Sequence, residues 1–240
     1  MCVIIYVPKG ACIGRKKLKQ CWEANPHGAG MMYPVDGNLI IKKGLMTFES
    51  VMEEYIQIRG KVDVVLHFRI ATHGTISPEN THPFEVLPGL GVAHNGIIEG
   101  IPREENESDT AAFAKLLKGL PDGWLETPGI MALVDIIANH GNKLAFMRAD
   151  GFLHFIGAGV KEHGCWFSND HWKPQRATMG WLNDWWSNGT SNGAKTTYRY
   201  QQVAERCEFC GQTDNTTHQW KDNGMICASC RQSFGARESY

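Results

Sequence analysis

Short apolar runs typical of β-strands alternate with segments of helical period through residues 1 to about 175, and this alternation constrains the fold most strongly. The run Val3 to Val7 is short and β-branched, which indicates a buried strand. Apolar residues between Phe48 and Ile58 recur close to the helical period. Further strands are expected at 39–42, 62–70, 90–93, 144–147 and 152–156, and helices at 109–120 and 130–138. This mixture predicts an α+β or layered α/β architecture.

The bulk properties exclude several classes of protein. The 240 residues suit one substantial domain with a small appendage. The formal net charge of −1 offers no electrostatic case for a nucleic-acid or anionic-membrane partner. No apolar run reaches the roughly 18 residues of a membrane span, and the start of the chain lacks the basic region of a secretory signal. We therefore expect a cytoplasmic protein with no membrane partner.

Cys2 directly follows Met1 and is small enough for the initiator methionine to be removed. A free cysteine is only a few per cent thiolate at neutral pH and needs a base beside it. An N-terminal cysteine carries that base itself, because its α-amine has a pKa of about 7.7 to 8.0. Cys2 is therefore a candidate nucleophile, although taken by itself a cysteine here is more often simply the first core residue of a strand.

Three other positions allow both a functional and a purely structural interpretation. Arg69 ends an apolar strand, where its planar guanidinium can clamp a substrate carboxylate or simply face solvent. Asn95-Gly96 can form a plain turn, or its amide and backbone N–H can form an oxyanion hole, in which one donor is worth about 3 kcal/mol. Asp109 can cap a helix or accept the α-ammonium group of an amino acid.

Taken in chain order, these positions resemble the class II glutamine amidotransferases, the type with an N-terminal nucleophile. The resemblance rests on Cys2, on HFRIATHG at 67–74, NTHPF at 80–84 and AHNGII at 93–98, and on Ser-Asp-Thr at 108–110. The sequence NPHGAG at 25–30 is similar to the family's Gly-rich turn before its next strand. The resemblance covers roughly residues 2 to 170.

The resemblance implies an α+β fold of the Ntn-hydrolase type, a four-layer αββα sandwich with two sheets face to face and helices outside. It implies glutamine as the substrate. The residues that it assigns are Cys2 as nucleophile, Asn95 and Gly96 as the oxyanion hole, Arg69 on the α-carboxylate and Asp109 on the α-amine. Thr72 and His73 would line the glutamine pocket, and His94 would support the Asn95 amide.

The implied reaction is attack of the thiolate on the γ-carbonyl, followed by hydrolysis of the thioester and delivery of ammonia to a second site. Two positions depart from the family pattern. Ala111 follows Asp-Thr where many relatives carry Glu, which weakens a secondary contact. Ile70 stands where relatives often carry an aromatic residue, which would alter pocket closure or glutamine affinity. Neither departure removes a residue that the resemblance assigns to the chemistry.

The expected division is an amidotransferase domain at 2–177, a Gly/Ser/Asn/Thr-rich linker at 178–203 and a zinc-ribbon-like module at 204–240. The module contains two Cys-x-x-Cys pairs, namely Cys207 with Cys210 and Cys227 with Cys230. Four thiolates at this spacing suit a closed, tetrahedral, structural Zn²⁺ site. A reducing compartment disfavours the alternative, a pair of disulfides.

Functions from different classes remain open. In the first, the protein is a glutaminase subunit that delivers ammonia to a separate synthase in trans, because only residues 178–240 follow the amidotransferase domain. In the second, it is a zinc-bearing binding or regulatory module with little glutaminase activity. A third is hydrolysis of another amide, against which the pairing of Arg69 with Asp109 counts. The mixed charges of residues 199–240 form no basic stripe, so nucleic acid ranks last as a partner.

Overall fold

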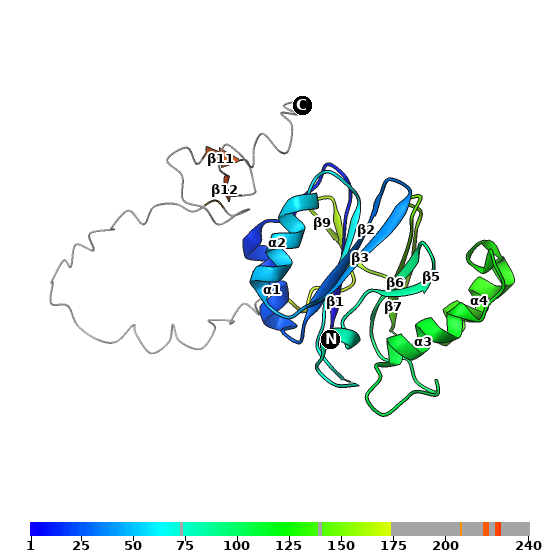
Figure 1. Cartoon of the computed structure of the whole chain (residues 1–240). Helices are drawn as coiled ribbons and strands as arrows, with labels where there is room; N and C mark the ends of the chain where they lie inside the picture. Colours follow the sequence, from blue (N-terminus) through cyan, green and yellow to red (C-terminus); the bar gives the residue numbers. More distant parts are fainter. Residues whose placement is uncertain (73, 139–140, 174–206, 208–217, 221–223, 227–240) are drawn as a thin grey trace, which may run out of the picture.

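The computed structural model describes residues 1–72, 74–138, 141–173, 207, 218–220 and 224–226. Over these residues the chain is a mixed α/β protein in which the paired strands of every sheet run antiparallel. Figure 1 shows two facing sheets with helices on their outer sides. Among the described residues, no helix combines the length and apolar character needed to cross a membrane.

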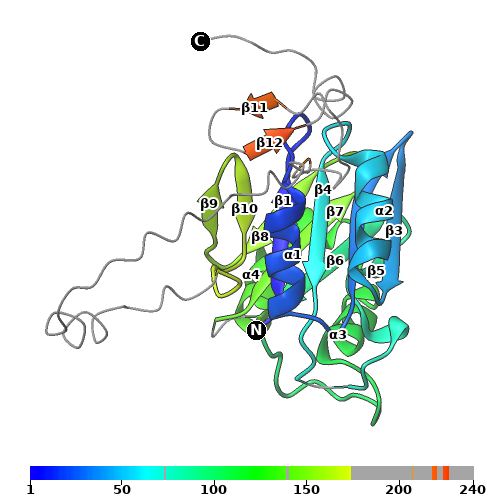
Figure 2. The same ribbon diagram turned by 90° about the vertical axis from the view of Figure 1, so that its left-hand side faces the viewer.

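The first sheet has six strands in the order β3-β2-β4-β1-β10-β9. They are β1 (Val3–Val7), β2 (Ala29–Val35), β3 (Asn38–Leu45), β4 (Val64–Phe68), β9 (Val160–Glu162) and β10 (Cys165–Phe167). Helices α1 (Arg15–Ala24) and α2 (Phe48–Ile58) lie across its outer face (Figure 2). Buried side chains from both helices, including Leu18 and Tyr55, pack there against the strands. The apolar face of α2 that its sequence predicts is therefore the face that covers the sheet.

The second sheet has four strands in the order β5-β6-β7-β8. They are β5 (Phe84–Leu87), β6 (Leu90–Asn95), β7 (Lys143–Arg148) and β8 (Leu153–Ile156). Helices α3 (Asp109–Lys118) and α4 (Pro128–Ala138) supply Phe113, Leu117 and Val134 to a core shared with this sheet. Two short 3₁₀ turns, η1 (Pro78–Asn80) and η2 (Trp124–Glu126), lie in the connections.

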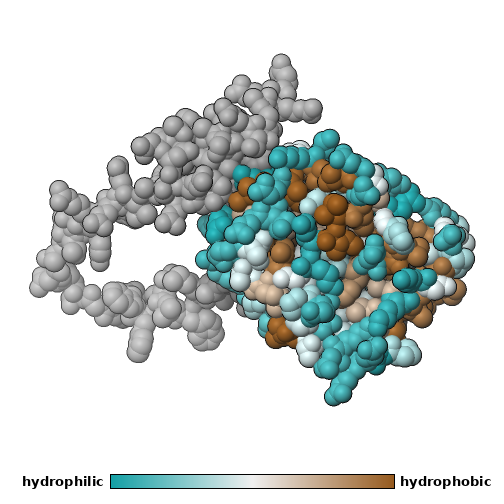
Figure 3. Space-filling model, viewed as in Figure 1, coloured by the Kyte–Doolittle hydropathy of each residue, from teal (hydrophilic) through white to brown (hydrophobic). Residues whose placement is uncertain are grey.

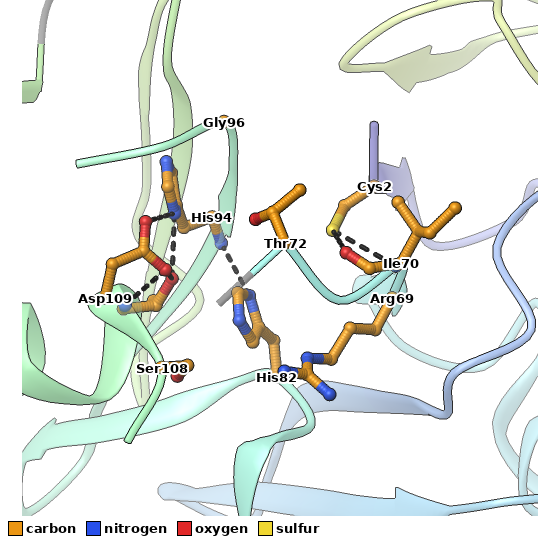
Figure 4. Close-up of a pocket in the computed structure, with 10 residues that line it drawn as sticks. Cys2, Arg69, Ile70, Thr72, His82, His94, Gly96, Ser108 and Asp109 are labelled. Atoms are coloured by element: carbon orange, nitrogen blue, oxygen red, sulfur yellow. Dashed lines mark hydrogen bonds and ion pairs between the residues drawn. The ribbon is translucent and has the colours of Figure 1, made fainter. Parts of the chain in front are cut away.

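A third group of buried side chains joins the two sheets. It contains Ile4, Met32 and Val65 from the first sheet and Ala93, Ala145 and Met147 from the second. The residue before β1, the residues after β4 and the end of β6 are thereby brought to one end of the two sheets (Figure 4). The first and third of these segments contain Cys2 and Asn95.

Near the C-terminus, β11 (His218–Trp220) and β12 (Gly224–Ile226) form a two-stranded antiparallel sheet. In the sequence these strands lie between the two Cys-x-x-Cys pairs. Cys207 is described and buried. The predicted linker at 178–203 and the cysteines Cys210, Cys227 and Cys230 lie outside the described residues, as does His73.

Candidate functional site

Cys2 precedes β1 and faces the segment that follows β4. Its Sγ lies 3.4 Å from the Ile70 carbonyl oxygen, to which it donates, and 3.4 Å from the Ile70 backbone nitrogen, which donates to it. Asn169 Nδ2 donates to the Cys2 carbonyl oxygen at 2.7 Å. Burial raises the pKa of the Cys2 thiol, while the Ile70 backbone, the N-terminal ammonium group and Arg69 act in the opposite direction. The thiol is therefore held in place but needs a base to become a thiolate.

A small polar pocket adjoins Cys2 (Figure 4). Its lining comes from both sheets and from the start of α3: Cys2, Arg69, Ile70, Thr72, His82, His94, Gly96, Ser108, Asp109 and Thr110. The pocket encloses about 10 Å³, room for about one water molecule. Of the residues to which the resemblance assigns a role, six line it, namely Cys2, Arg69, Thr72, His94, Gly96 and Asp109. The structure thus brings the predicted nucleophile next to an arginine and a carboxylate.

Arg69 is a buried cation, with 2% of its surface exposed. Its backbone is fixed by the Gly-rich turn, because Arg69 N donates to Gly28 O at 2.8 Å and Arg69 O accepts from His27 N at 2.9 Å. The guanidinium Nη1 donates to Thr75 O at 3.1 Å. Burial lowers the pKa of Arg69, while Cys2 and Asp109 raise it. Since a guanidinium stays protonated in proteins, the pocket contains a fixed positive charge.

Asp109 is the first residue of α3, and Ser108 is the N-cap, accepting from Ala111 N at 3.2 Å. The Asp109 carboxylate accepts from two backbone groups, Thr110 N at 2.9 Å and Ile98 N at 2.8 Å. Each bond goes to a different oxygen, so each oxygen retains a lone pair for another donor. Asp109 therefore ties the segment after Gly96 to α3 and still presents a negative charge at the pocket.

The backbone at Gly96 is shaped by Asn142. Gly96 has φ +144°, and a Cβ there would lie 1.9 Å from Asn142 Oδ1, so only glycine fits. Asn142 Nδ2 donates to Ile97 O at 3.0 Å, and Asn142 Oδ1 lies 2.8 Å from His94 Nε2. That oxygen can only accept, so His94 Nε2 carries the proton and His94 Nδ1 accepts from Thr110 Oγ1 at 2.8 Å. Asn142 thus holds the residue before and the residue after the Asn95-Gly96 pair, namely His94 and Ile97.

Asn95 is buried but is not among the residues that line the pocket. Its Nδ2 lies 2.9 Å from Ser168 Oγ. In the described part of the chain, Asn95 Oδ1 is buried without a hydrogen-bond partner. The sequence interpretation did not single out Ser168, Asn169 or Asn142. The available signal for the first two was a polar pair directly after the apolar strand β10.

Three histidines form a stack behind the pocket. The ring centroids of His67 and His82 are 4.0 Å apart, and those of His82 and His94 are 6.3 Å apart. His67 Nε2 donates to His94 O at 2.9 Å, and His94 N donates to His82 Nδ1 at 3.3 Å. Burial lowers the pKa of all three rings, that of His67 to about 3. The stack therefore joins β4 to β6 as a neutral group beside the charged Arg69.

A larger cavity of about 670 Å³ also adjoins Cys2. It shares Cys2, Ile70, Thr72 and Gly96 with the polar pocket. Its rim includes Ile136 and Ile137 of α4, which are 65% and 44% exposed. In Figure 3 the hydrophobic surface of the visible face is gathered mainly near its upper middle, and the side that carries α4 is mixed. Cys2 thus lines both the small polar pocket and the larger cavity.

Metal-binding side chains are not gathered at this site. Within the residues that the structure describes, no group of three or more His, Cys, Asp or Glu side chains is placed to hold a metal ion. The predicted zinc site cannot be placed in the same way, because Cys210, Cys227 and Cys230 lie outside those residues.

Comparison with known proteins finds relatives over part of the chain. No family model matches it. The chain is 32% identical over 130 residues to the glutamine–fructose-6-phosphate aminotransferase (isomerizing) of Buchnera aphidicola, covering 45% of this chain and 21% of the relative. It is 37% identical over 81 residues to the enzyme of the same name from Mycobacterium leprae, covering 31% and 13%.

It is also 35% identical over 129 residues to the putative glutamine amidotransferase YafJ of Escherichia coli, covering 49% of this chain and 50% of the relative. The chain therefore spans half or less of the length of these curated relatives. The homologues are glutamine amidotransferases at modest identity, which supports an amidotransferase domain here.

Proposed function

We propose that this protein is a class II glutamine amidotransferase in which Cys2, freed of Met1, hydrolyses the γ-amide of glutamine. The observation that carries the proposal is the polar pocket, where the Cys2 thiol, the Arg69 guanidinium and the Asp109 carboxylate meet. The names of the homologues support the same activity. The succession of α1 and α2, two facing sheets, and α3 and α4 supports a four-layer αββα sandwich of the Ntn-hydrolase type.

Glutamine would be recognised by its two charged groups. Arg69 binds the α-carboxylate, because its planar fork matches both oxygens. Asp109 accepts the α-ammonium group through the lone pairs that its backbone bonds leave available. The pocket of about 10 Å³ must widen to admit glutamine. Thr72 and Ile70 line both cavities, and their segment is proposed to move so that the pocket widens. The role of His73 in the glutamine pocket stays a prediction from the sequence.

The chemistry uses the N-terminus as its base. The free α-amine of Cys2 takes the thiol proton, and the thiolate attacks the γ-carbonyl carbon. The Gly96 N–H and the Asn95 amide donate to the oxyanion as the tetrahedral intermediate forms. The protonated α-amine then delivers its proton to the leaving nitrogen, and ammonia departs as the thioester forms. Water adds to the thioester, again assisted by the amine, and releases glutamate and the free thiol.

The ammonia is proposed to reach a separate synthase in trans. The large cavity beside Cys2 gives it a route away from the polar pocket. The exposed Ile136 and Ile137 at its rim provide an apolar surface on which such a partner can pack. The proposed glutaminase site lies in the described part of the first 173 residues. The substrate that accepts the ammonia would be bound by the partner.

The C-terminal segment is proposed to be a structural zinc module. The antiparallel strands β11 and β12 lie in the sequence between the two cysteine pairs, as expected for a ribbon held by knuckles on either side. In a reducing cytoplasm the four thiols stay available for the metal. We expect one zinc per chain by elemental analysis, lost in Cys210→Ser and kept in Cys12→Ser. Metal-free protein, or full zinc content in Cys210→Ser, would contradict this assignment.

The decisive experiment measures glutamate release from glutamine by the purified chain, with asparagine as the rival substrate. Intact mass first establishes that Met1 has been removed. Activity should vanish in Cys2→Ala and persist in Cys12→Ala, a half-buried cysteine outside the pocket lining. Processed protein that is inactive with glutamine, both by itself and with candidate synthases, would refute the glutaminase and favour a binding module.

A further inference from the structure

We propose that Ser168 is a positioning residue that orients the Asn95 amide with its NH₂ group available to the oxyanion. The proposal rests on the proposed glutaminase function. It starts from the buried Asn95 Oδ1, which lacks a hydrogen-bond partner in the described part of the chain. A polar atom placed in this way needs an explanation, because buried carboxamides are normally satisfied.

The contacts of Ser168 favour the opposite orientation of the Asn95 side-chain amide, with Oδ1 and Nδ2 exchanged. Ser168 Oγ accepts from Ile4 N at 2.9 Å and lies 2.9 Å from Asn95 Nδ2. In that arrangement the serine oxygen accepts twice, and neither contact uses its own proton. The oxygen and nitrogen of a carboxamide have almost the same shape and can exchange places. After the exchange, Ser168 still accepts from Ile4 N and donates its proton to Asn95 Oδ1.

The exchange also changes what Asn95 can do. The NH₂ group now occupies the position of the buried atom that has no partner. The next residue is Gly96, which lines the polar pocket and supplies the second proposed donor. The unsatisfied group is then a donor that gains its acceptor when the oxyanion forms, which is the arrangement that catalysis by electrostatic preorganisation requires.

The place of Ser168 in the fold connects it to the nucleophile as well. Ser168 N donates to Ile4 O at 2.9 Å, so the residue is bonded to β1 through both its backbone and its side chain. Its neighbour Asn169 donates to Cys2 O at 2.7 Å. Cys2 directly precedes β1 of the first sheet, and Asn95 ends β6 of the second. Ser168 therefore sets the oxyanion donor relative to the strand that carries the thiol.

The test is a double-mutant cycle on glutamine hydrolysis with Asn95→Ala, Ser168→Ala and the pair. Asn95→Ala should lower kcat by about 10² to 10³. Ser168→Ala should lower kcat at least tenfold and leave KM unchanged, because Arg69 and Asp109 still hold the substrate. In the Asn95→Ala background, Ser168→Ala should cost nothing further. An equal loss in both backgrounds would mean that Ser168 acts independently of Asn95 and would overturn the proposal.

A second readout separates positioning of the amide from damage to the nucleophile. Alkylation of Cys2 by iodoacetamide breaks a carbon–iodine bond and forms no oxyanion. Ser168→Ala should therefore be alkylated at the wild-type rate, whereas Asn169→Ala, which loses the bond to Cys2 O, should be slower in both alkylation and hydrolysis. A parallel loss of alkylation in Ser168→Ala would overturn the proposal.

A neutron diffraction structure decides the amide orientation even for a protein that proves inactive with glutamine. Asn95 Oδ1 facing Ser168 supports the proposal, and Asn95 Nδ2 facing Ser168 overturns it. Failure of the glutaminase function itself would appear separately, as absence of hydrolysis in the wild-type protein.

Discussion

Acidification from pH 7 to pH 5 should strongly destabilise this protein through its histidine stack. His67 is 0% exposed and His82 4% exposed, and burial lowers the pKa of both. The unfolded chain takes up protons near pH 6.5, whereas folded His67 does so only near pH 3. Within this window the unfolded state binds more protons, so the free energy of unfolding falls as the pH falls.

The expected loss in the free energy of unfolding follows from the width of this pH range. Each pH unit below 6.5 costs about 1.4 kcal/mol per histidine that stays neutral in the folded state. Between pH 7 and pH 5 that is about 2 kcal/mol for His67, and about 4 kcal/mol if His82 behaves alike. A whole domain is stable by only about 5 to 15 kcal/mol. The pKa of the Glu162 carboxylate is lowered to about 2. Its contribution to stability is lost only below about pH 4.5, so it does not account for the loss between pH 7 and pH 5.

The assay is urea unfolding followed by tryptophan fluorescence at several pH values from 8 to 5. His67→Gln keeps a side-chain donor for His94 O but does not titrate, so the pH dependence should fall by about half. His171→Gln should keep the full dependence, because that residue is exposed to solvent in the folded protein. Constant stability from pH 7 to pH 5, or an unchanged slope in His67→Gln, would refute this reasoning.

Three further predictions concern activity. Arg69→Lys should raise the KM for glutamine at least tenfold in steady-state glutaminase assays, because a single ammonium cannot replace the bidentate fork; an unchanged KM would remove Arg69 from substrate binding. Gly96→Ala should lower kcat about 10²-fold, because its Cβ would meet Asn142 Oδ1 at 1.9 Å; Gly129→Ala, which meets nothing within 4 Å, should retain activity. The kcat/KM of the wild type should rise from pH 6 to about 8 as the Cys2 α-amine loses its proton, and a flat profile would exclude the amine as the base.

The fold was predictable wherever a segment had a clear period and an end signal. The predicted bounds of β1 and α2 agree with the structure, and α3 begins at Asp109 as predicted. The helix α1 was not predicted, because it buries only Leu18 and Cys21 and its other residues are largely polar. Strand β4 is shorter than the predicted 62–70, and β9 and β10 have three residues each, too few for a period to show.

Residues that line the pocket could be named from the sequence only where one continuous segment carries a motif. Arg69 and Asp109 stand in such motifs, and both line the pocket, while their roles in binding remain predictions. Ser168 and Asn142 act instead through contacts with Asn95 and His94 that join residues 73 and 48 positions apart. No local pattern encodes such contacts, because the first arises from the packing of one sheet on the other and the second from the pairing of β6 with β7.

The distribution of the chemistry over two sheets explains why these long-range contacts are needed. The thiol and the guanidinium sit on the first sheet, while the proposed oxyanion donors sit on the second and Asp109 starts the helix that covers it. Neither sheet alone holds a complete site. The apolar side chains between the two sheets set the spacing of the sheets. Two hydrogen bonds between the sheets, from His67 to His94 O and between Asn95 and Ser168, set the register of one sheet on the other. Because directed hydrogen bonds tolerate displacement poorly, we expect these two contacts to fix the relative positions of the proposed site residues more tightly than the apolar core does.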